Sequence, residues 1–225
     1  MLRLPTAFLF DLDGTLIDSV YQHVLAWHEA LSSEQIELAV WRIHRKIGMS
    51  GGLFANMLLR ETGLKIEPER IERLQQHHAA AYRARIQHVR PLPGARELLT
   101  FLSEAGIPWA IATSGRMETA GPAIETLGLD MSRVPIITRD RVKYAKPDPD
   151  LFLAAADALN VDISACFIVG DSVWDMLAAR RARGLGVGLL SGGYGLEELE
   201  RAGAYRVFED PAQLLDHIDE LGARR

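Results

Sequence analysis

The sequence has almost no cysteine, no excess of positive charge and no long apolar run. Cys166, its one cysteine, stands in the apolar run ACFIV without a partner for an internal disulfide, so we expect an inert core thiol and a reducing environment. Lys and Arg total 25 against 30 Asp and Glu, and this net charge of −5 argues against nucleic acid as a partner. No apolar run could span a bilayer and aspartates interrupt the early one, so we expect no membrane segment or signal peptide and, by default, a cytoplasmic location.

Short apolar segments alternate with helical patterns through most of the chain. Such alternation is typical of an α/β protein with a doubly wound parallel sheet, a Rossmann-like core covered by helices on both faces. The predicted helices of this part are 95–105, 118–127, 150–159 and 173–182. The predicted strands are 7–10, 109–112, 134–137, 166–169, 185–190 and 205–208.

One long stretch, residues 18–88, shows helical spacing without a strand signal. We expect four helices there, near 18–31, 34–46, 53–62 and 68–88, with Asp18 or Ser19 capping the first and a glycine-rich loop at 48–52. The simplest organisation is an all-helical cap, residues 18–88, inserted into a core made of residues 1–17 and 89–225. The linkers are expected near 14–18 and 88–94.

Polar residues follow four of the predicted strands, at the point where each strand ends. Because ligands bind at the carboxyl ends of parallel strands, we expect these side chains to meet at one edge of the sheet. They are Asp11 and Asp13, then Thr113 and Ser114, then Lys143 or Lys146, and finally Asp171 and Asp175.

These residue types are those of a phosphate site with a cation. Asp11, Asp171 and Asp175 offer the hard oxygen ligands that Mg²⁺ prefers, although Asp175 could instead only favour a helix start. Thr113 and Ser114 can donate hydrogen bonds to phosphate, although they could also cap a helix, and Lys146 adds positive charge, with Lys143 as its rival.

The spacing of the first two aspartates suggests their chemistry. Asp11 can attack phosphorus in line with the leaving oxygen and form an aspartyl-phosphate. Residues two apart share a face in an extended chain, so Asp13 can reach the same site. There it would protonate the leaving group and then activate water. A turn that merely contains two aspartates remains the alternative.

Four segments together resemble the haloacid dehalogenase superfamily: DLDGT at 11–15, the strand into Thr113, AKPDPDLF around Lys146, and GDSVWD at 170–175. The resemblance implies Asp11 as nucleophile and Asp13 as general acid and base. It implies Asp11, the main-chain carbonyl of Asp13 and Asp171 as Mg²⁺ ligands, with Asp175 binding the ion or a ligand. Since dehalogenases and phosphonoacetaldehyde hydrolases lack the second aspartate, Asp13 favours phosphate transfer.

Within that superfamily, DSVYQHVLAW at 18–27 is similar to the cap entrance of β-phosphoglucomutase and related sugar phosphatases. His23 is a candidate substrate contact or orients Asp13, although a structural histidine is commoner. Gly48 and Ser50 could gate the substrate or form a plain loop. Because the loop lacks the arginine with which mutases hold a second phosphate, we expect a phosphatase for a small phosphorylated metabolite, monomeric or homodimeric. A sugar-phosphate mutase and a non-catalytic binding protein are the alternatives.

Overall fold

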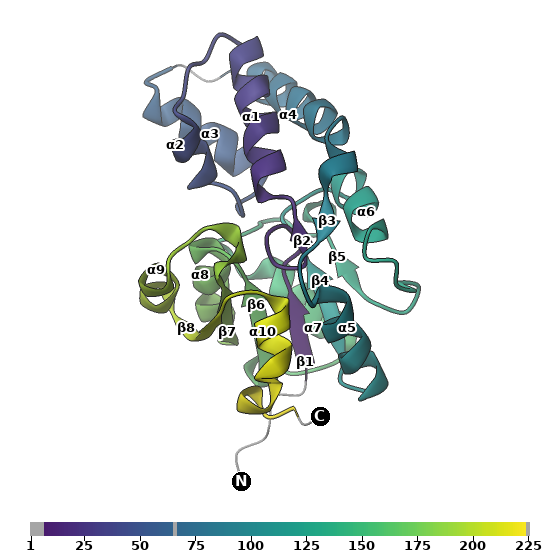
Figure 1. Cartoon of the computed structure of the whole chain (residues 1–225). Helices are drawn as coiled ribbons and strands as arrows, with labels where there is room; N and C mark the ends of the chain where they lie inside the picture. Colours follow the sequence, from purple (N-terminus) through teal and green to yellow (C-terminus); the bar gives the residue numbers. More distant parts are fainter. Residues whose placement is uncertain (1–6, 65–66, 224–225) are drawn as a thin grey trace.

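A six-stranded parallel sheet lies at the centre of the protein, in a computed structural model that describes residues 7–64 and 67–223 (Figure 1). The strand order is β5-β4-β1-β6-β7-β8, which confirms the predicted α/β class. The bounds are β1 (Ala7–Phe10), β4 (Trp109–Ala112), β5 (Ile136–Ile137), β6 (Cys166–Gly170), β7 (Leu185–Leu189) and β8 (Ala204–Phe208).

The apolar strands are explained by helices on both faces of the sheet. On one face Phe8 and Phe10 pack with residues of α5 (Ala95–Glu104), α6 (Met117–Glu125) and α10 (Pro211–Asp216). On the other, Leu9 packs with residues of α7 (Asp150–Leu159) and α8 (Val173–Ala182). Helix α9 (Leu196–Ala202) packs beside α8 through a smaller cluster. Cys166 lies in the core as expected, and burial raises the pKa of its thiol to about 11.

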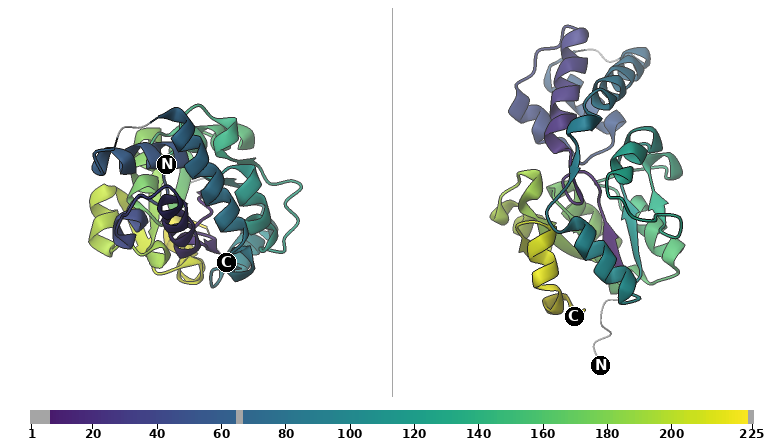
Figure 2. Two further views of the ribbon diagram at one scale, coloured as in Figure 1. Left: turned by 90° about the horizontal axis from the view of Figure 1, so that it is seen from above. Right: turned by 45° about the vertical axis from the view of Figure 1, so that its right-hand side comes forward.

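The helices between β1 and β4 have an apolar core of their own. They are α1 (Val20–Ser33), α2 (Val40–His44), α3 (Gly51–Glu61) and α4 (Pro68–Arg83). Trp27 and Phe54 pack against each other in this core, with tilted rings whose centroids are 4.3 Å apart. Figures 1 and 2 show the four helices grouped beyond the carboxyl ends of the strands. The division into core and cap stays a prediction, and residues 1–6 and 224–225 of the predicted core lie outside the described residues.

The two predicted linkers pair with each other. Strand β2 (Ile17–Asp18) lies antiparallel to β3 (Arg90–Pro91), with Ile17 opposite Pro91. The amide of Leu92 also donates to the carbonyl of Leu16, at 2.9 Å. The chain therefore enters and leaves the helical segment at the same place.

Several predicted boundaries are wrong. The helix expected over 34–46 shrinks to α2: Gln35 adopts a left-handed φ of 57° after α1, and the backbone of Ala39, just before α2, is extended. Conversely, α3 begins at Gly51, inside the expected loop, since Ser50 accepts a hydrogen bond from the amide of Leu53. Strand β5 loses its first half at Pro135, which has no amide hydrogen to give to a ladder.

Helices α7 and α8 have the predicted bounds, whereas α5 and α6 differ from the predicted bounds by one or two residues. Helix α4 ends at Arg83, and the last part of the predicted 68–88 helix is a 3-10 turn, Ile86–His88. The short helices α9 and α10 were not predicted. None of the helices in the described ranges is long and apolar enough to cross a membrane.

Candidate active site

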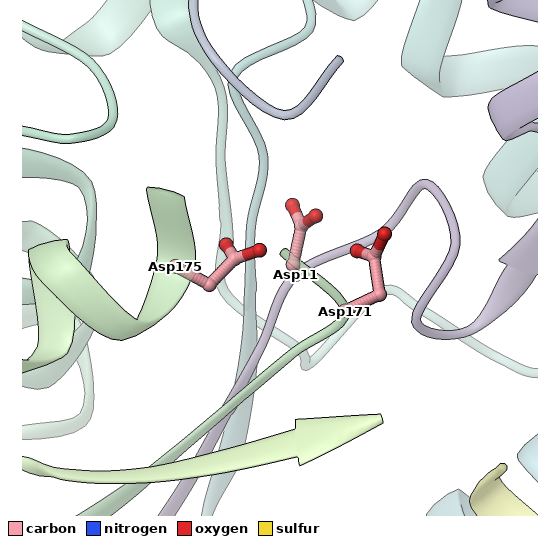
Figure 3. Close-up of side chains that lie close together, drawn as sticks. All are labelled: Asp11, Asp171 and Asp175. Atoms are coloured by element: carbon pink, nitrogen blue, oxygen red, sulfur yellow. The ribbon is translucent and has the colours of Figure 1, made fainter. Parts of the chain in front are cut away.

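Three buried carboxylates meet where strands β1 and β6 end. Asp11 follows β1, Asp171 follows β6, and Asp175 lies in the first turn of α8 (Figure 3). One carboxylate oxygen from each lies within 4.8 Å of the others, so together they could hold a metal ion. The sheet therefore brings together residues that are 160 positions apart in the chain, as parallel topology requires.

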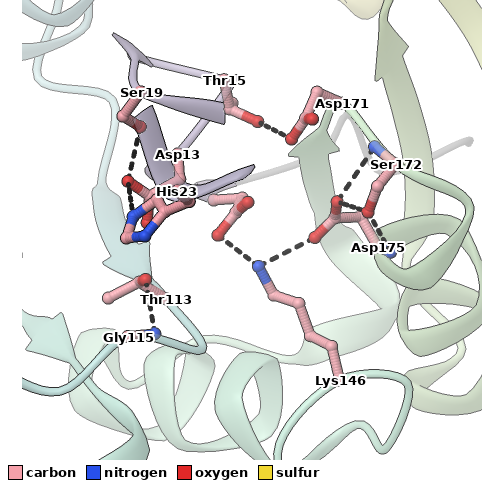
Figure 4. Close-up of polar contacts among 11 residues, drawn as sticks. Asp13, Thr15, Ser19, His23, Thr113, Gly115, Lys146, Asp171, Ser172 and Asp175 are labelled. Atoms are coloured by element: carbon pink, nitrogen blue, oxygen red, sulfur yellow. Dashed lines mark hydrogen bonds and ion pairs between the residues drawn. The ribbon is translucent and has the colours of Figure 1, made fainter. Parts of the chain in front are cut away.

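Lys146 lies inside this cluster with a fully buried side chain. Its ammonium forms an ion pair with Asp11 and lies 2.8 Å from Oδ1 of Asp175 (Figure 4). The rival Lys143 is exposed, with its ammonium over the ring of Tyr144. The geometry thus places Lys146, and not Lys143, beside the predicted nucleophile.

The cluster carries more negative than positive charge. Burial raises the pKa of Asp11 to about 7, although Lys146 acts in the opposite direction. Burial, together with Asp175 and Asp11, raises the pKa of Asp171 well above its usual value. One ammonium cannot neutralise three carboxylates, so a divalent cation with a preference for oxygen ligands fits this donor set.

Asp171 is held by close backbone packing. Thr15 donates to its Oδ1 at 3.1 Å, and Gly14, at a φ of 85°, approaches its other oxygen. Gly192 packs so closely that a Cβ there would overlap the carboxylate. Ser191 donates to the carbonyl of Gly14 at 2.6 Å and connects this turn to the loop that follows Asp11. Of these residues around Asp171, only Gly14 and Thr15 belong to a motif that the sequence analysis singled out.

Asp175 lies both at the start of α8 and in the acidic cluster, and its role as a metal ligand stays a prediction. Its Oδ2 accepts hydrogen bonds from the amide and hydroxyl of Ser172, at 3.1 and 2.5 Å, and forms a capping box at the start of α8. Its Oδ1 faces Lys146. One carboxylate therefore starts a helix and belongs to the acidic cluster at the same time.

The carboxylate of Asp13 has separate partners. Ser19 donates to its Oδ1 at 2.6 Å, and Nε2 of His23 lies 3.2 Å from the same oxygen. Burial alone would raise the pKa of Asp13, but His23 and Ser19 outweigh it and the pKa is lowered. Ser19, one of the two expected capping residues, is the N-cap residue of α1, but its hydroxyl makes no cap hydrogen bond and donates to Asp13 instead.

A pocket of about 470 Å³ opens over Asp11 and Asp13. The hydroxyl of Ser114 is buried there without a hydrogen-bond partner among the described residues, whereas that of Thr113 accepts from the amide of Gly115 at 3.0 Å. The candidate substrate contacts Thr113, Ser114, His23, Gly48 and Ser50 all line this pocket. The candidate contact Lys146 is fully buried and is not among the residues that line it.

The loop residues among these candidates also have structural partners. Gly48 adopts a φ of 98° and packs against Ser172, where a Cβ would lie 2.7 Å from the hydroxyl. Ser50 caps α3. Beside them, His44 bonds to the carbonyl of Gly192 at 2.8 Å. The helical segment thus touches the same turn that packs on Asp171.

The model of the haloacid dehalogenase-like hydrolase family matches residues 5–183. The chain belongs to this family. Hexitol phosphatase A of Escherichia coli K12 is 35% identical over 180 residues, 78% of each chain. The phosphoglycolate phosphatase of Rhodospirillum rubrum is 30% identical over 236 residues, covering 98% of this chain and 96% of its own.

A solved structure of a hydrolase from Pseudomonas syringae superposes on this haloacid dehalogenase-like protein with a TM-score of 0.93. It is 58% identical, over 96% of this chain and 98% of the other. The predicted resemblance and the prediction of a phosphatase-type enzyme are confirmed at the level of the family. The separate roles of the site residues stay predictions.

Proposed function

We propose that this protein hydrolyses a small phosphorylated metabolite with the help of Mg²⁺, through an aspartyl-phosphate on Asp11. One observation carries the proposal. A buried carboxylate at the wall of a pocket is paired with a buried lysine, and two further carboxylates lie within 4.8 Å of it. We also propose that α1–α4 act as a cap over this pocket.

Asp11, Asp171 and Asp175 would hold the metal ion, together with the main-chain carbonyl of Asp13. When bound, Mg²⁺ would neutralise charge on the carboxylates and on the transferring phosphoryl group. The excess of negative charge around Asp11 and the oxygen-only donor set support this assignment.

The first step needs a nucleophile and donors for the phosphate oxygens. Asp11 attacks phosphorus, and the bond from phosphorus to the leaving oxygen breaks. The unpartnered hydroxyl of Ser114 is free to donate to a phosphate oxygen. Lys146 favours the ionised form of Asp11 against the effect of burial, and it balances the charge that builds up on the phosphoryl group.

Asp13 would move the protons of both steps. Because its pKa is lowered, the protonated acid is the minor form of Asp13 in the free protein. That form gives its proton to the leaving oxygen, and the carboxylate then takes a proton from the water that attacks the aspartyl-phosphate, which restores the acid. Ser19 and His23 both contact Oδ1, which fixes the carboxylate plane. No hydrogen bond to the second oxygen, Oδ2, occurs among the described residues, so that oxygen can serve the reaction.

We predict that Asp13→Asn lowers kcat for an alkyl phosphate by roughly 10²- to 10⁴-fold, the range usual for a general acid–base. The amide keeps the size of the side chain and the hydrogen bond from Ser19, so circular dichroism should be unchanged. Asp18→Asn changes an exposed carboxylate nearby and should leave kcat as it is. A normal kcat in Asp13→Asn would remove Asp13 from the mechanism.

The mutase alternative requires a cation on the helical side of the pocket for a second phosphate. Among the described lining residues from α1–α4 and their loops, Lys46 is the one lysine or arginine, and it lies 2.8 Å from Glu61. Arg45 pairs with Glu198 instead. Both cations are thus committed to carboxylates, which favours hydrolysis over phosphate exchange.

A phosphate-release panel tests the proposed function. The names of the relatives suggest that it should include hexitol phosphates and phosphoglycolate, together with β-glucose 1-phosphate. We expect release of inorganic phosphate with MgCl₂ and loss of that release with excess EDTA, restored by added Mg²⁺. Isomer formation without phosphate release would favour the mutase, and EDTA-resistant release would contradict the role of the metal.

A further inference from the structure

A second histidine, His78 on α4, lies directly behind His23. Its Nε2 is 3.1 Å from Nδ1 of His23, and Nε2 of His23 is 3.2 Å from Oδ1 of Asp13. The three side chains form one continuous line of polar contacts from α4 to the carboxylate. The reaction described above assigns no role to His78.

Aromatic stacking fixes both imidazole rings. The ring of His23 lies on Tyr82, with centroids 3.8 Å apart and planes 4° apart. The ring of His78 lies on Trp27, with centroids 4.2 Å apart and planes 15° apart. The rings alternate between the two helices, because His23 and Trp27 are one turn apart on α1, and His78 and Tyr82 are one turn apart on α4.

Stacking sets the ring planes but does not choose which nitrogen faces Asp13. A carboxylate oxygen only accepts hydrogen bonds, so Nε2 of His23 must carry a hydrogen to bond Asp13. A partner for Nδ1 on the opposite side holds the ring in that orientation, and His78 is that partner. Burial, and the neighbouring His23, keep the pKa of His78 well below its usual value, so His78 stays neutral beside His23.

We propose that His78 is a positioning residue, which acts through His23 to hold Asp13 in place for proton transfer. The inference rests on the proposed function, since it assumes that Asp13 exchanges protons with the leaving group and with water. The contact line and the two ring stacks together carry it.

The test separates the two chemical steps. His78→Phe keeps a ring on Trp27 but has no nitrogen for His23. With p-nitrophenyl phosphate the leaving group departs without protonation, so formation of the aspartyl-phosphate should be unchanged. Water activation still needs Asp13. Stopped-flow absorbance should therefore show a burst of up to one equivalent of p-nitrophenolate, followed by a steady rate about 10- to 100-fold below that of the wild type.

Two matched variants control for structural damage. His78→Gln keeps a polar group that can reach His23, and it should recover most of the steady rate. His77→Phe makes the same change at the neighbouring exposed histidine, which contacts Ser33, and it should behave as the wild type. If His78→Phe does not fold, His78→Leu gives the same test with a smaller apolar side chain.

Three outcomes would overturn the inference alone: a normal steady rate in His78→Phe, an equal fall of the burst and steady phases, or a His78→Gln variant as slow as His78→Phe. Each would mean that His78 contributes packing and not the orientation of Asp13. A wild-type protein that releases no phosphate from any substrate would instead overturn the proposed function, and this inference with it.

Discussion

Asp11→Asn should abolish phosphate release, with a loss of at least about 10⁴-fold, because an amide cannot form the aspartyl-phosphate. The fold should survive. Lys146 keeps its ion pair with Asp175, and the variant no longer buries a carboxylate whose pKa is raised to about 7. The melting temperature should therefore be equal to or above that of the wild type.

The measurement is a phosphate-release assay with Mg²⁺, together with thermal unfolding of the same samples. Asp157→Asn, an exposed position on α7, is the matched control and should keep full activity. Substantial hydrolysis by Asp11→Asn would mean that another group attacks phosphorus, and the mechanism proposed here would fail.

Lys146→Met should lower both stability and activity. Removal of the ammonium leaves buried carboxylates at Asp11 and Asp175 without their cation, a change that usually costs about 3–5 kcal/mol of unfolding free energy. The effect should shrink as the pH falls from 8 to 5. Over that range Asp11, with its raised pKa, takes up a proton and no longer needs a cation.

Urea unfolding at pH 8 and pH 5 measures the loss of stability in Lys146→Met at each pH. Phosphate release measures the loss of activity. Lys143→Met removes the same charge from an exposed side chain three residues earlier, so it should be neutral in both assays. Equal stability of Lys146→Met and the wild type at pH 8 would contradict the assigned charge balance.

Much of the sheet layer could be predicted because its strands are short apolar runs that end in polar residues. The buried strands β1, β4 and β6 match the predicted segments within a residue. The same logic placed Asp11, Asp171 and Asp175 at one edge, since parallel strands must bring their carboxyl ends together.

The helical segment was harder to predict because single residues override its periodicity. A helix over 34–46 satisfies local propensity, yet the chain turns at Gln35 so that Ile36 can reach the core of this segment. Strands β2 and β3 contain two residues each, too few for any period to show. Their pairing depends on contact between distant positions.

The residues that hold the site residues in place could not be predicted either, because they also depend on contacts between distant positions. Ser19 precedes a helix and looks like a cap, but a carboxylate at Asp13 competes for its hydroxyl. His78 stands in a polar, charged helix, and its contact with His23 forms only when α4 packs on α1. Two pairs with four-residue spacing, His23 with Trp27 and His78 with Tyr82, were the available signal.

The antiparallel pairing of β2 with β3 has an evolutionary consequence. Because the inserted chain departs and returns through adjacent strands, this pairing is one junction that an exchange of residues 18–88 between relatives has to match. If this segment acts as the proposed cap, its replacement changes substrate preference while Asp11, Lys146 and Asp171 stay the same. The contact of His44 with Gly192 is the second junction that such a chimaera would have to preserve.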